Sequence, residues 1–214
     1  IHSFPTRRSS DLSVEPGAVS SFGALDQIIK HLGNRTLFPA LRAIVVAGHS
    51  GGGQVVQRFA LTGHDHPTLQ TAGISLRFVV ANPSSYAYFS PQRPVPFKVA
   101  DCPGFNDWKY GMQHLPAYAK GQSAEQLEQA YVSRDITYLL GQQDTDPNHP
   151  ALDKSCEAET QGAYRLIRGH NYFDSLKQRH PQLTQKLVEV PGVGHNGDGM
   201  FTSPEGQNVL FSRY

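Results

Sequence analysis

The sequence predicts an α/β fold with a mainly parallel sheet of about four strands and helices flanking it. Short apolar runs alternate along the chain with segments whose apolar residues recur every three or four positions, which is the pattern of β-α-β units. The apolar runs are nearly continuous, as in strands that are covered on both faces of a parallel sheet. The length of 214 residues suits a single domain that can bury a sizeable core.

The first predicted helix shows how each element is assigned. Ser20 or Ser21 can cap it, and Gly33-Asn34 would end it. Its apolar residues fit a period near 3.6: Leu25, Ile28, Ile29 and Leu32. By the same criteria, strands are predicted at 42–48, 75–85, 135–141 and 186–192, and helices at 22–32, 52–61, 124–132, 161–179 and 205–211.

Residues 83–134 interrupt this alternation. The segment between Asn82 and the helix at 124–132 is rich in proline and aromatic residues, including Tyr86 and Trp108. An insertion of this length is usually a lid or another functional excursion, not a plain connection. We therefore expect a lid or cap at about 83–134.

Composition excludes several classes of function. The net charge is +1 with Lys and Arg scattered along the chain, whereas a nucleic-acid-binding protein needs a clustered basic face. The chain has no run of 18 apolar residues, so no transmembrane segment is expected. Cys102 and Cys156 are too few for a disulfide framework, and one bridge or two buried thiols both remain open.

The first residues, "IHSFPTRRSSDL", resemble the translation of a common sequencing adapter. We expect residues 1–12 to be a non-native leader and exclude them from reasoning about the fold. The genuine protein is then expected to begin upstream, with residues 13–214 as part of a domain. Any export signal would lie in that upstream part, so the sequence leaves the localisation unknown.

The stretch Gly48-His49-Ser50-Gly51-Gly52 satisfies G-x-S-x-G. It follows an apolar run and precedes a helical pattern, which is the setting of a nucleophile elbow. Flanking glycines let the backbone turn sharply at the serine. A phosphate-binding loop would need a different glycine spacing or a lysine that is absent here. The motif predicts Ser50 as a nucleophile.

With a base and an acid further along, the chain resembles the α/β-hydrolase superfamily, whose triad runs Ser, Asp or Glu, then His. The resemblance covers Phe22 to the C-terminus. It rests on Ser50, on Asp144 in "YLLGQQDTDP" and on His195 in "VEVPGVGHNGDG". It implies the C-terminal half of that fold, with these three residues as a catalytic triad and no cofactor.

The chemistry of the three side chains fits these roles. His195 can take the Ser50 proton and return it to the leaving group, while Asp144 fixes the imidazole tautomer. Asp146 is a rival acid, and Asp198 is a weaker one because it is so near His195 in sequence. His49 is expected to shape the turn. Gly192, Gly194, Gly197 and Gly199 are expected to let the His195 loop bend back toward Ser50.

The resemblance also implies that the backbone N–H of Gly51 is one oxyanion donor, with the second donor upstream of Ser13. The first four strands of the family's sheet are expected to be absent. The strand at 43–48 would then be an exposed edge. We therefore expect the chain as given to have impaired activity and to self-associate.

The expected substrate is a small carboxylic ester, with Asn82, Tyr86 and Trp108 following the second strand as candidate substrate-binding residues. An amidase, peptidase or acyltransferase would use the same triad, and a non-catalytic binding protein with this fold is a further alternative. No metal is expected. The segment 144–155 lacks the glycine and glutamate of a calcium loop, and His64-Asp65-His66 lacks a second ligand pair at zinc spacing.

Overall fold

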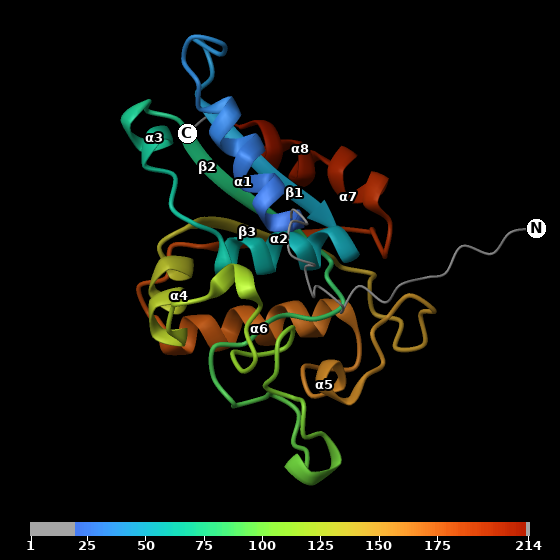
Figure 1. Cartoon of the computed structure of the whole chain (residues 1–214). Coiled ribbons are helices and arrows are strands. Elements are labelled where there is room, and N and C mark those ends of the chain that lie inside the picture. Colours follow the sequence, from blue (N-terminus) through green and yellow to red (C-terminus); the bar gives the residue numbers. More distant parts are fainter. Residues whose placement is uncertain (1–19, 213–214) are drawn as a thin grey trace, which may run out of the picture.

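Four parallel strands form the sheet in the computed structural model, which describes residues 20–212. The leader-like residues 1–12 lie outside the described part. The strands are adjacent in sequence order, β1-β2-β3-β4 (Figure 1). They span Ala43–His49 (β1), Ser75–Ala81 (β2), Asp135–Gly141 (β3) and Lys186–Val190 (β4). The predicted α/β class with a parallel sheet is confirmed.

The register brings the carboxyl ends of all four strands to one edge of the sheet. His49 pairs with Ala81, Ala81 with Leu139, and Gly141 with Val190. The residues that follow these strands therefore meet at the same edge, where α/β proteins build their sites. Ser50, Asn82, Asp144 and His195 all come from these connections.

Helices cover both faces of the sheet (Figure 1). On one face lie α1 (Ser21–Leu32), α2 (Gly51–Thr62), α4 (Ala124–Val132) and α6 (Arg165–Arg179), and on the other α7 (Gly197–Thr202) and α8 (Pro204–Phe211). Alternation along β2 fixes this division, because Phe78 and Val80 join the core under the first group while Val79 and Ala81 join the core under α7 and α8.

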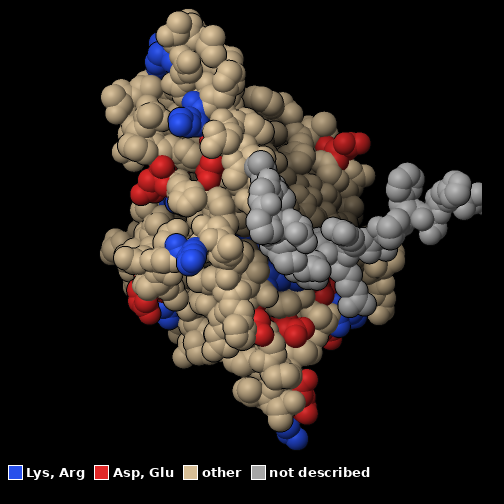
Figure 2. Space-filling view, in the orientation of Figure 1, with Lys and Arg blue, Asp and Glu red and all other residues tan. Residues whose placement is uncertain are grey.

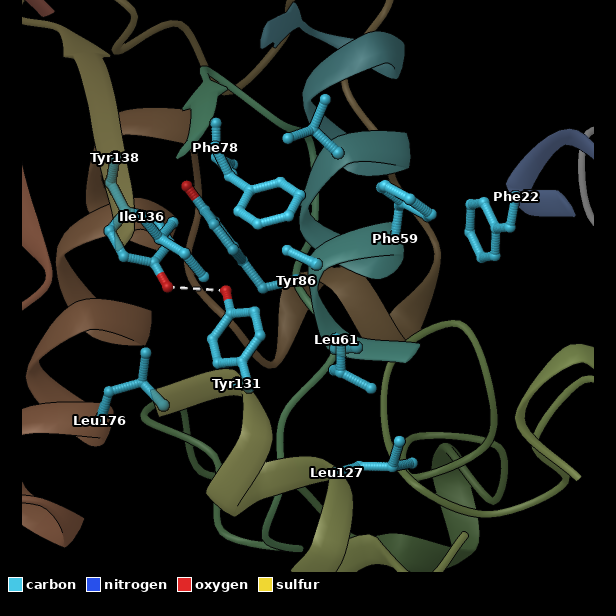
Figure 3. Packing of buried hydrophobic residues seen from close by; sticks show 14 of the residues in the cluster. Phe22, Phe59, Leu61, Phe78, Tyr86, Leu127, Tyr131, Ile136, Tyr138 and Leu176 are labelled. Atoms are coloured by element: carbon cyan, nitrogen blue, oxygen red, sulfur yellow. Dashed lines mark hydrogen bonds between the residues drawn. The ribbon is translucent and has the colours of Figure 1, made fainter. Parts of the chain in front are cut away.

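The larger core contains many aromatic side chains beside its aliphatic ones (Figure 3). Tyr86 stacks on Tyr172 with ring centroids 4.5 Å apart. The hydroxyls of Tyr131 and Tyr138 lie 2.7 Å apart, and Tyr138 also donates to Gln185. The hydroxyls of Tyr131 and Tyr138 can be buried because they bond to each other instead of to water. The buried hydroxyls of Tyr86 and Tyr88, in contrast, have no hydrogen-bond partner among the described residues.

Several predicted boundaries differ from the structure. The strand predicted at 75–85 ends at Ala81, because Asn82 adopts a positive φ of 42° and leaves the sheet. The helix predicted at 161–179 begins at Arg165. Three short helices were not predicted: α3 (Pro67–Thr71), α5 (Cys156–Glu159) and α7. Ile28, assigned to the apolar face of α1, is 55% exposed.

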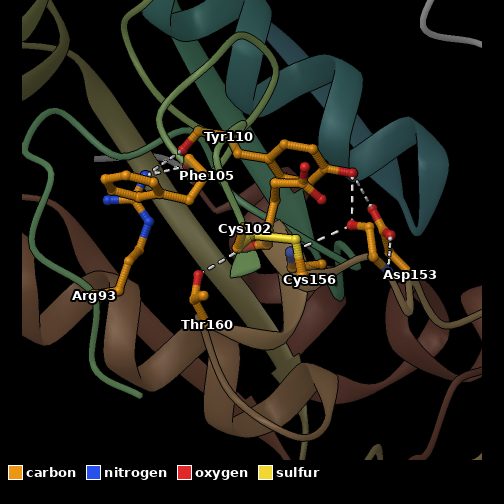
Figure 4. Close-up of a disulfide and its surroundings, with 10 residues drawn as sticks. Arg93, Cys102, Phe105, Tyr110, Asp153, Cys156 and Thr160 are labelled. Atoms are coloured by element: carbon orange, nitrogen blue, oxygen red, sulfur yellow. Dashed lines mark hydrogen bonds between the residues drawn. A yellow bond between two sulfur atoms is a disulfide. The ribbon is translucent and has the colours of Figure 1, made fainter. Parts of the chain in front are cut away.

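Before α4, the insertion contains two turns of 3-10 helix, η1 (Val99–Asp101) and η2 (Ala117–Ala119), and an isolated β-bridge between Asp107 and Gln113. A disulfide joins Cys102 to Cys156 at the start of α5, with a Cα–Cα separation of 5.8 Å (Figure 4). Tyr110 reinforces the attachment, since its hydroxyl bonds to Asp153 and Ser155 at 2.9 Å each. The insertion is thus fastened to the connection between β3 and α6.

Candidate active site

Ser50 occupies the tight turn between β1 and α2. Its φ of 57° and ψ of −118° are a rare combination for a residue with a Cβ and indicate a strained turn. Two glycines make the turn possible by close backbone approach. A Cβ on Gly48 would lie 2.4 Å from the carbonyl of Gly52, and a Cβ on Gly53 would lie 2.5 Å from the Ala81 oxygen.

Ser50, His195 and Asp144 are connected by two hydrogen bonds. The Ser50 Oγ lies 2.9 Å from His195 Nε2, and His195 Nδ1 lies 2.7 Å from Asp144 Oδ2. With the proton on Nδ1, the ring donates to the carboxylate and accepts from the hydroxyl. The structure thus brings together, from the ends of three strands, the three side chains expected to form a triad.

Backbone hydrogen bonds hold the loops that carry the acid and the base. The Asp144 N–H donates to Gly141 O at 3.0 Å, and the Gln143 N–H donates to Val193 O at 2.9 Å. The second bond joins the Asp144 loop directly to the loop that carries His195. The separation of Asp144 from His195 is therefore set by main-chain geometry.

The two aspartates that competed for the role of acid have different surroundings. The side chain of Asp144 is 2% exposed and faces His195. Asp146 is exposed and accepts the Asn148 N–H within its own turn. Asp198, the weaker rival, is also exposed and lies in the first turn of α7. Gly197 and Gly199 were expected to belong to the loop that carries His195, but they lie in the first turn of α7.

Gly51 is the first residue of α2. The first four N–H groups of a helix have no partner inside it, and the helix dipole favours negative charge at this end. The Gly51 N–H is therefore suited to an oxyanion next to Ser50.

The three predicted substrate-binding residues lie in different surroundings. Asn82 is fully buried; its amide donates to Gly194 O at 3.4 Å, and its Oδ1 accepts the Gly141 N–H at 2.8 Å. It therefore joins the end of β3 to the loop before His195. Tyr86 is fully buried in the larger core, and Trp108 packs against that core while partly exposed.

Two further histidine rings flank His195. The ring centroid of His49 lies 4.6 Å from that of His195, and the ring centroid of His149 lies 4.9 Å from it. The rings of His149 and His195 meet edge to face. Burial, reinforced by the neighbouring His195, lowers the pKa of His49 to about 4, so His49 is neutral at pH 7. The contact of His149 with His195 was not predicted. Its place in the loop that carries Asp144 was the one indication in the sequence that it could lie near the site.

The remaining features concern metals, membranes and charge. Across residues 20–212, close His, Cys, Asp or Glu ligand atoms occur in one group, Cys102, Cys156 and Glu157, whose sulfurs are bonded to each other. None of the described helices combines the length and apolar character needed to cross a bilayer. Charged side chains of both signs are interspersed over the face in Figure 2.

Comparisons with known proteins identify similar solved structures. No protein-family model and no curated protein matches the sequence. A poly(aspartic acid) hydrolase from Sphingomonas sp. KT-1 is 28% identical with a TM-score of 0.56, over 83% of this chain and 57% of its own. A poly(3-hydroxybutyrate) depolymerase from Bordetella parapertussis is 22% identical with a TM-score of 0.63, over 89% of this chain and 56% of its own.

The chain thus spans a little more than half the length of these two proteins. Both are hydrolases by name, and the agreement in fold extends over most of the residues present here. The chain therefore has an α/β-hydrolase-like fold.

Proposed function

We propose that this chain carries the active site of a serine hydrolase that cleaves carboxylic esters. The observation that carries the proposal is the pair of hydrogen bonds from Ser50 Oγ to His195 Nε2 and from His195 Nδ1 to Asp144 Oδ2. A hydroxyl, an imidazole and a buried carboxylate in this order form the arrangement that activates a serine.

In the proposed reaction, Ser50 Oγ attacks the acyl carbon while His195 Nε2 takes the hydroxyl proton. Asp144 stabilises the imidazolium that results. The negative charge moves to the former carbonyl oxygen, which the Gly51 N–H can bond. Collapse of the intermediate breaks the ester C–O bond, and the alcohol leaves with the proton from His195. Water then hydrolyses the acyl-enzyme by the same steps and restores Ser50.

A fluorophosphonate probe followed by peptide mass spectrometry tests the proposal. We expect an adduct on Ser50 that is lost in Ser50→Ala and in His195→Ala. His114→Ala is the matched control, because the His114 side chain is 82% exposed and pairs with Asp107 in the insertion. Labelling that is absent from Ser50, or that persists undiminished in His195→Ala, would contradict the proposal.

Amide hydrolysis is a second candidate, because the similar structure with 28% identity is a poly(aspartic acid) hydrolase and that polymer is joined by amide bonds. The same triad can attack either carbonyl. Paired substrates with one acyl group, presented as an ester and as an anilide, separate the two activities. Faster turnover of the anilide, relative to the uncatalysed reaction of each substrate, would favour the amidase.

The insertion is proposed to take part in substrate selection, with Trp108 as one of its partly exposed aromatic residues. Trp108→Ala is then expected to reduce kcat/KM for bulky esters more than for short-chain esters. Equal losses on both classes would indicate that Trp108 acts through core packing alone. The intact Ser50, Asp144 and His195 argue against a non-catalytic protein, which would not need to keep all three.

A further inference from the structure

We propose that Arg165 is a positioning residue for Asp144, holding the carboxylate oxygen that faces away from His195. Arg165 Nη1 lies 3.4 Å from Asp144 Oδ1, while Asp144 Oδ2 lies 2.7 Å from His195 Nδ1. Each oxygen of the carboxylate therefore has its own hydrogen-bond partner. This inference rests on the proposed function, since it gives Arg165 a task in the same site.

Arg165 is itself fixed in place. The residue is fully buried, its Nε donates to Ser84 Oγ at 3.1 Å, and its Nη2 donates to Ala151 O at 2.5 Å. Ser84 follows β2, and Ala151 lies in the connection that carries Asp144. The planar guanidinium can meet all three acceptors at once, so its orientation relative to the carboxylate is determined.

The backbone adds a second link between the start of α6 and Asp144. Arg165 is the first residue of α6, and the N–H of Leu166 donates to Asp144 O at 3.1 Å. One end of α6 thus contacts Asp144 through both a side chain and the main chain. The helix is 15 residues long and packs on β3, which makes it a rigid support for the acid.

Burial explains why the second oxygen needs a cation. Asp144 is 2% exposed, so water does not solvate its charge. A buried carboxylate held through one oxygen only can rotate toward another donor. Such a rotation would release His195 from its tautomer and orientation. Arg165 supplies a charge-assisted hydrogen bond to the second oxygen that opposes the rotation.

The charged and titratable groups around the site come from several elements. His49 ends β1 directly before Ser50, and His149 and Asp146 belong to the connection after β3. Tyr86 follows β2, and His195 follows β4. Arg165 is the cation that contacts the carboxylate of Asp144 directly among the described residues. Loss of this charge should therefore change the pH dependence of the labelling rate at Ser50 more than loss of a more distant charge.

Arg168 provides a matched control. It is also fully buried on α6, and it donates to Gly162 O at 2.7 Å, to Ser84 O at 2.6 Å and to Asp153 O at 2.9 Å. Like Arg165 it holds the segments that follow β2 and β3. Its hydrogen bonds go to backbone oxygens and not to Asp144. A merely structural role for Arg165 predicts similar behaviour for both arginines.

The experiment measures the rate of fluorophosphonate labelling at Ser50 against pH in the chain as given, in Arg165→Met, Arg165→Lys, Arg168→Met and Arg168→Lys. At pH 7 we expect Arg165→Met to be labelled about 10- to 100-fold more slowly, the penalty typical of a misplaced catalytic group. The acid limb of its pH–rate profile should move to higher pH, because a cation that disfavours protonation of the site has been removed. Arg165→Lys should recover part of both losses.

The pH–rate profiles of the Arg168 variants should have the same acid limb as that of the unaltered chain. The inference is overturned if Arg165→Met has the same acid limb as the unaltered chain. It is also overturned if the Arg165 and Arg168 variants shift the acid limb of the pH–rate profile equally. Circular dichroism first establishes that each variant is folded. Should Arg165→Met fail to fold, Arg165→Gln replaces it, because glutamine keeps a hydrogen-bond donor without the charge.

A second measurement separates this inference from the proposed function. The ¹⁵N chemical shifts of the His195 ring at pH 8 report which nitrogen carries the proton. We expect the Nδ1–H form in the unaltered chain and in Arg168→Met, and a mixture of tautomers in Arg165→Met. If Ser50 is never labelled, the proposed function fails while this readout still tests Arg165; unchanged tautomer populations in Arg165→Met overturn the inference.

Discussion

At the scale of single residues, the connection after β3 holds two carboxylates whose surroundings differ. Asp144 is buried between His195 and Arg165, whereas Asp146 is exposed and bonds within its own turn. An amide in place of a carboxylate keeps the shape of the side chain but can favour the wrong tautomer of its histidine partner. The two positions therefore provide a matched pair.

Asp144→Asn should slow the labelling of Ser50 by about 1,000- to 10,000-fold, by comparison with the effect of this substitution in a serine protease triad. Asp146→Asn should leave the labelling rate within a few-fold of the unaltered chain. The rates are measured at pH 7 with one probe concentration. A larger loss in Asp146→Asn than in Asp144→Asn would transfer the role of acid to Asp146.

His49 predicts how stability depends on pH. Burial and the nearby His195 lower its pKa from 6.5 to about 4, so the unfolded chain binds more protons than the folded chain between these values. Stability is then fully present above about pH 6.5 and is lost as the pH falls toward 4. The loss is on the order of 1–3 kcal/mol.

His49→Gln should therefore flatten part of this dependence. The measurement is Tm from pH 7.5 to 4.5 in both chains. His66, whose pKa is also lowered mainly by burial, stays in both and leaves a residual slope. Equal slopes in the two chains would show that His49 binds protons as readily in the folded state as in the unfolded chain.

At the scale of elements, the turn between β1 and α2 depends on specific glycines. A Cβ on Gly48 would meet the backbone of Gly52, but a Cβ on Gly52 has no atom within 4 Å. Gly48→Ala should destabilise the fold by about 1–3 kcal/mol, whereas Gly52→Ala should change it by less than about 1 kcal/mol. Denaturant unfolding of both variants checks the contrast, and equal costs would contradict it.

The disulfide joins the insertion, through Cys102, to the start of α5, where Cys156 lies 54 residues further along the chain. Loss of a bridge that closes a loop of this size typically costs about 2–4 kcal/mol. Cys102→Ser/Cys156→Ser should unfold at correspondingly lower denaturant concentration than the unaltered chain under oxidising conditions. Under strong reducing conditions the two chains should converge. A difference that persists after reduction would point to packing of the cysteines as its cause.

The strands and long helices could be predicted because their signals are local. Continuous apolar runs located the four strands of the described sheet, and 3.6-residue periods located the long helices. The ends of α4 and β3 agree with their predicted bounds. The end of β2 could not be predicted, because it depends on Asn82 bonding to Gly141, a residue 59 positions away. The short helices α3, α5 and α7 are too brief for a periodic signal.

The candidate site shows the same division. Ser50 and its glycines are a contiguous motif, so the sequence alone points to them. Arg165 and His149 reach Asp144 and His195 only through the tertiary fold. Tyr86 was expected at a pocket because it follows β2, yet it is buried against Tyr172. Aromatic residues serve cores and binding sites alike, so their type does not separate the two.

At the scale of the whole molecule, β1 is an edge strand of the described sheet. Ala47 on this strand is exposed and Val45 is partly exposed. An apolar edge with unpaired backbone groups can pair with another chain. We expect the chain to associate in a concentration-dependent manner, as measured by light scattering after size exclusion. Ala47→Lys should reduce association, and a monomer at every concentration would contradict the expectation.

The bridge between Cys102 and Cys156 also decides what a protease would leave behind. The ring that it closes contains Asp144, while Ser50 and His195 lie outside the ring on either side. A single cut between residues 103 and 155 would therefore separate the chain into two pieces only after reduction. On a non-reducing gel the nicked protein would still migrate as one covalent species, with all three residues of the candidate triad in it.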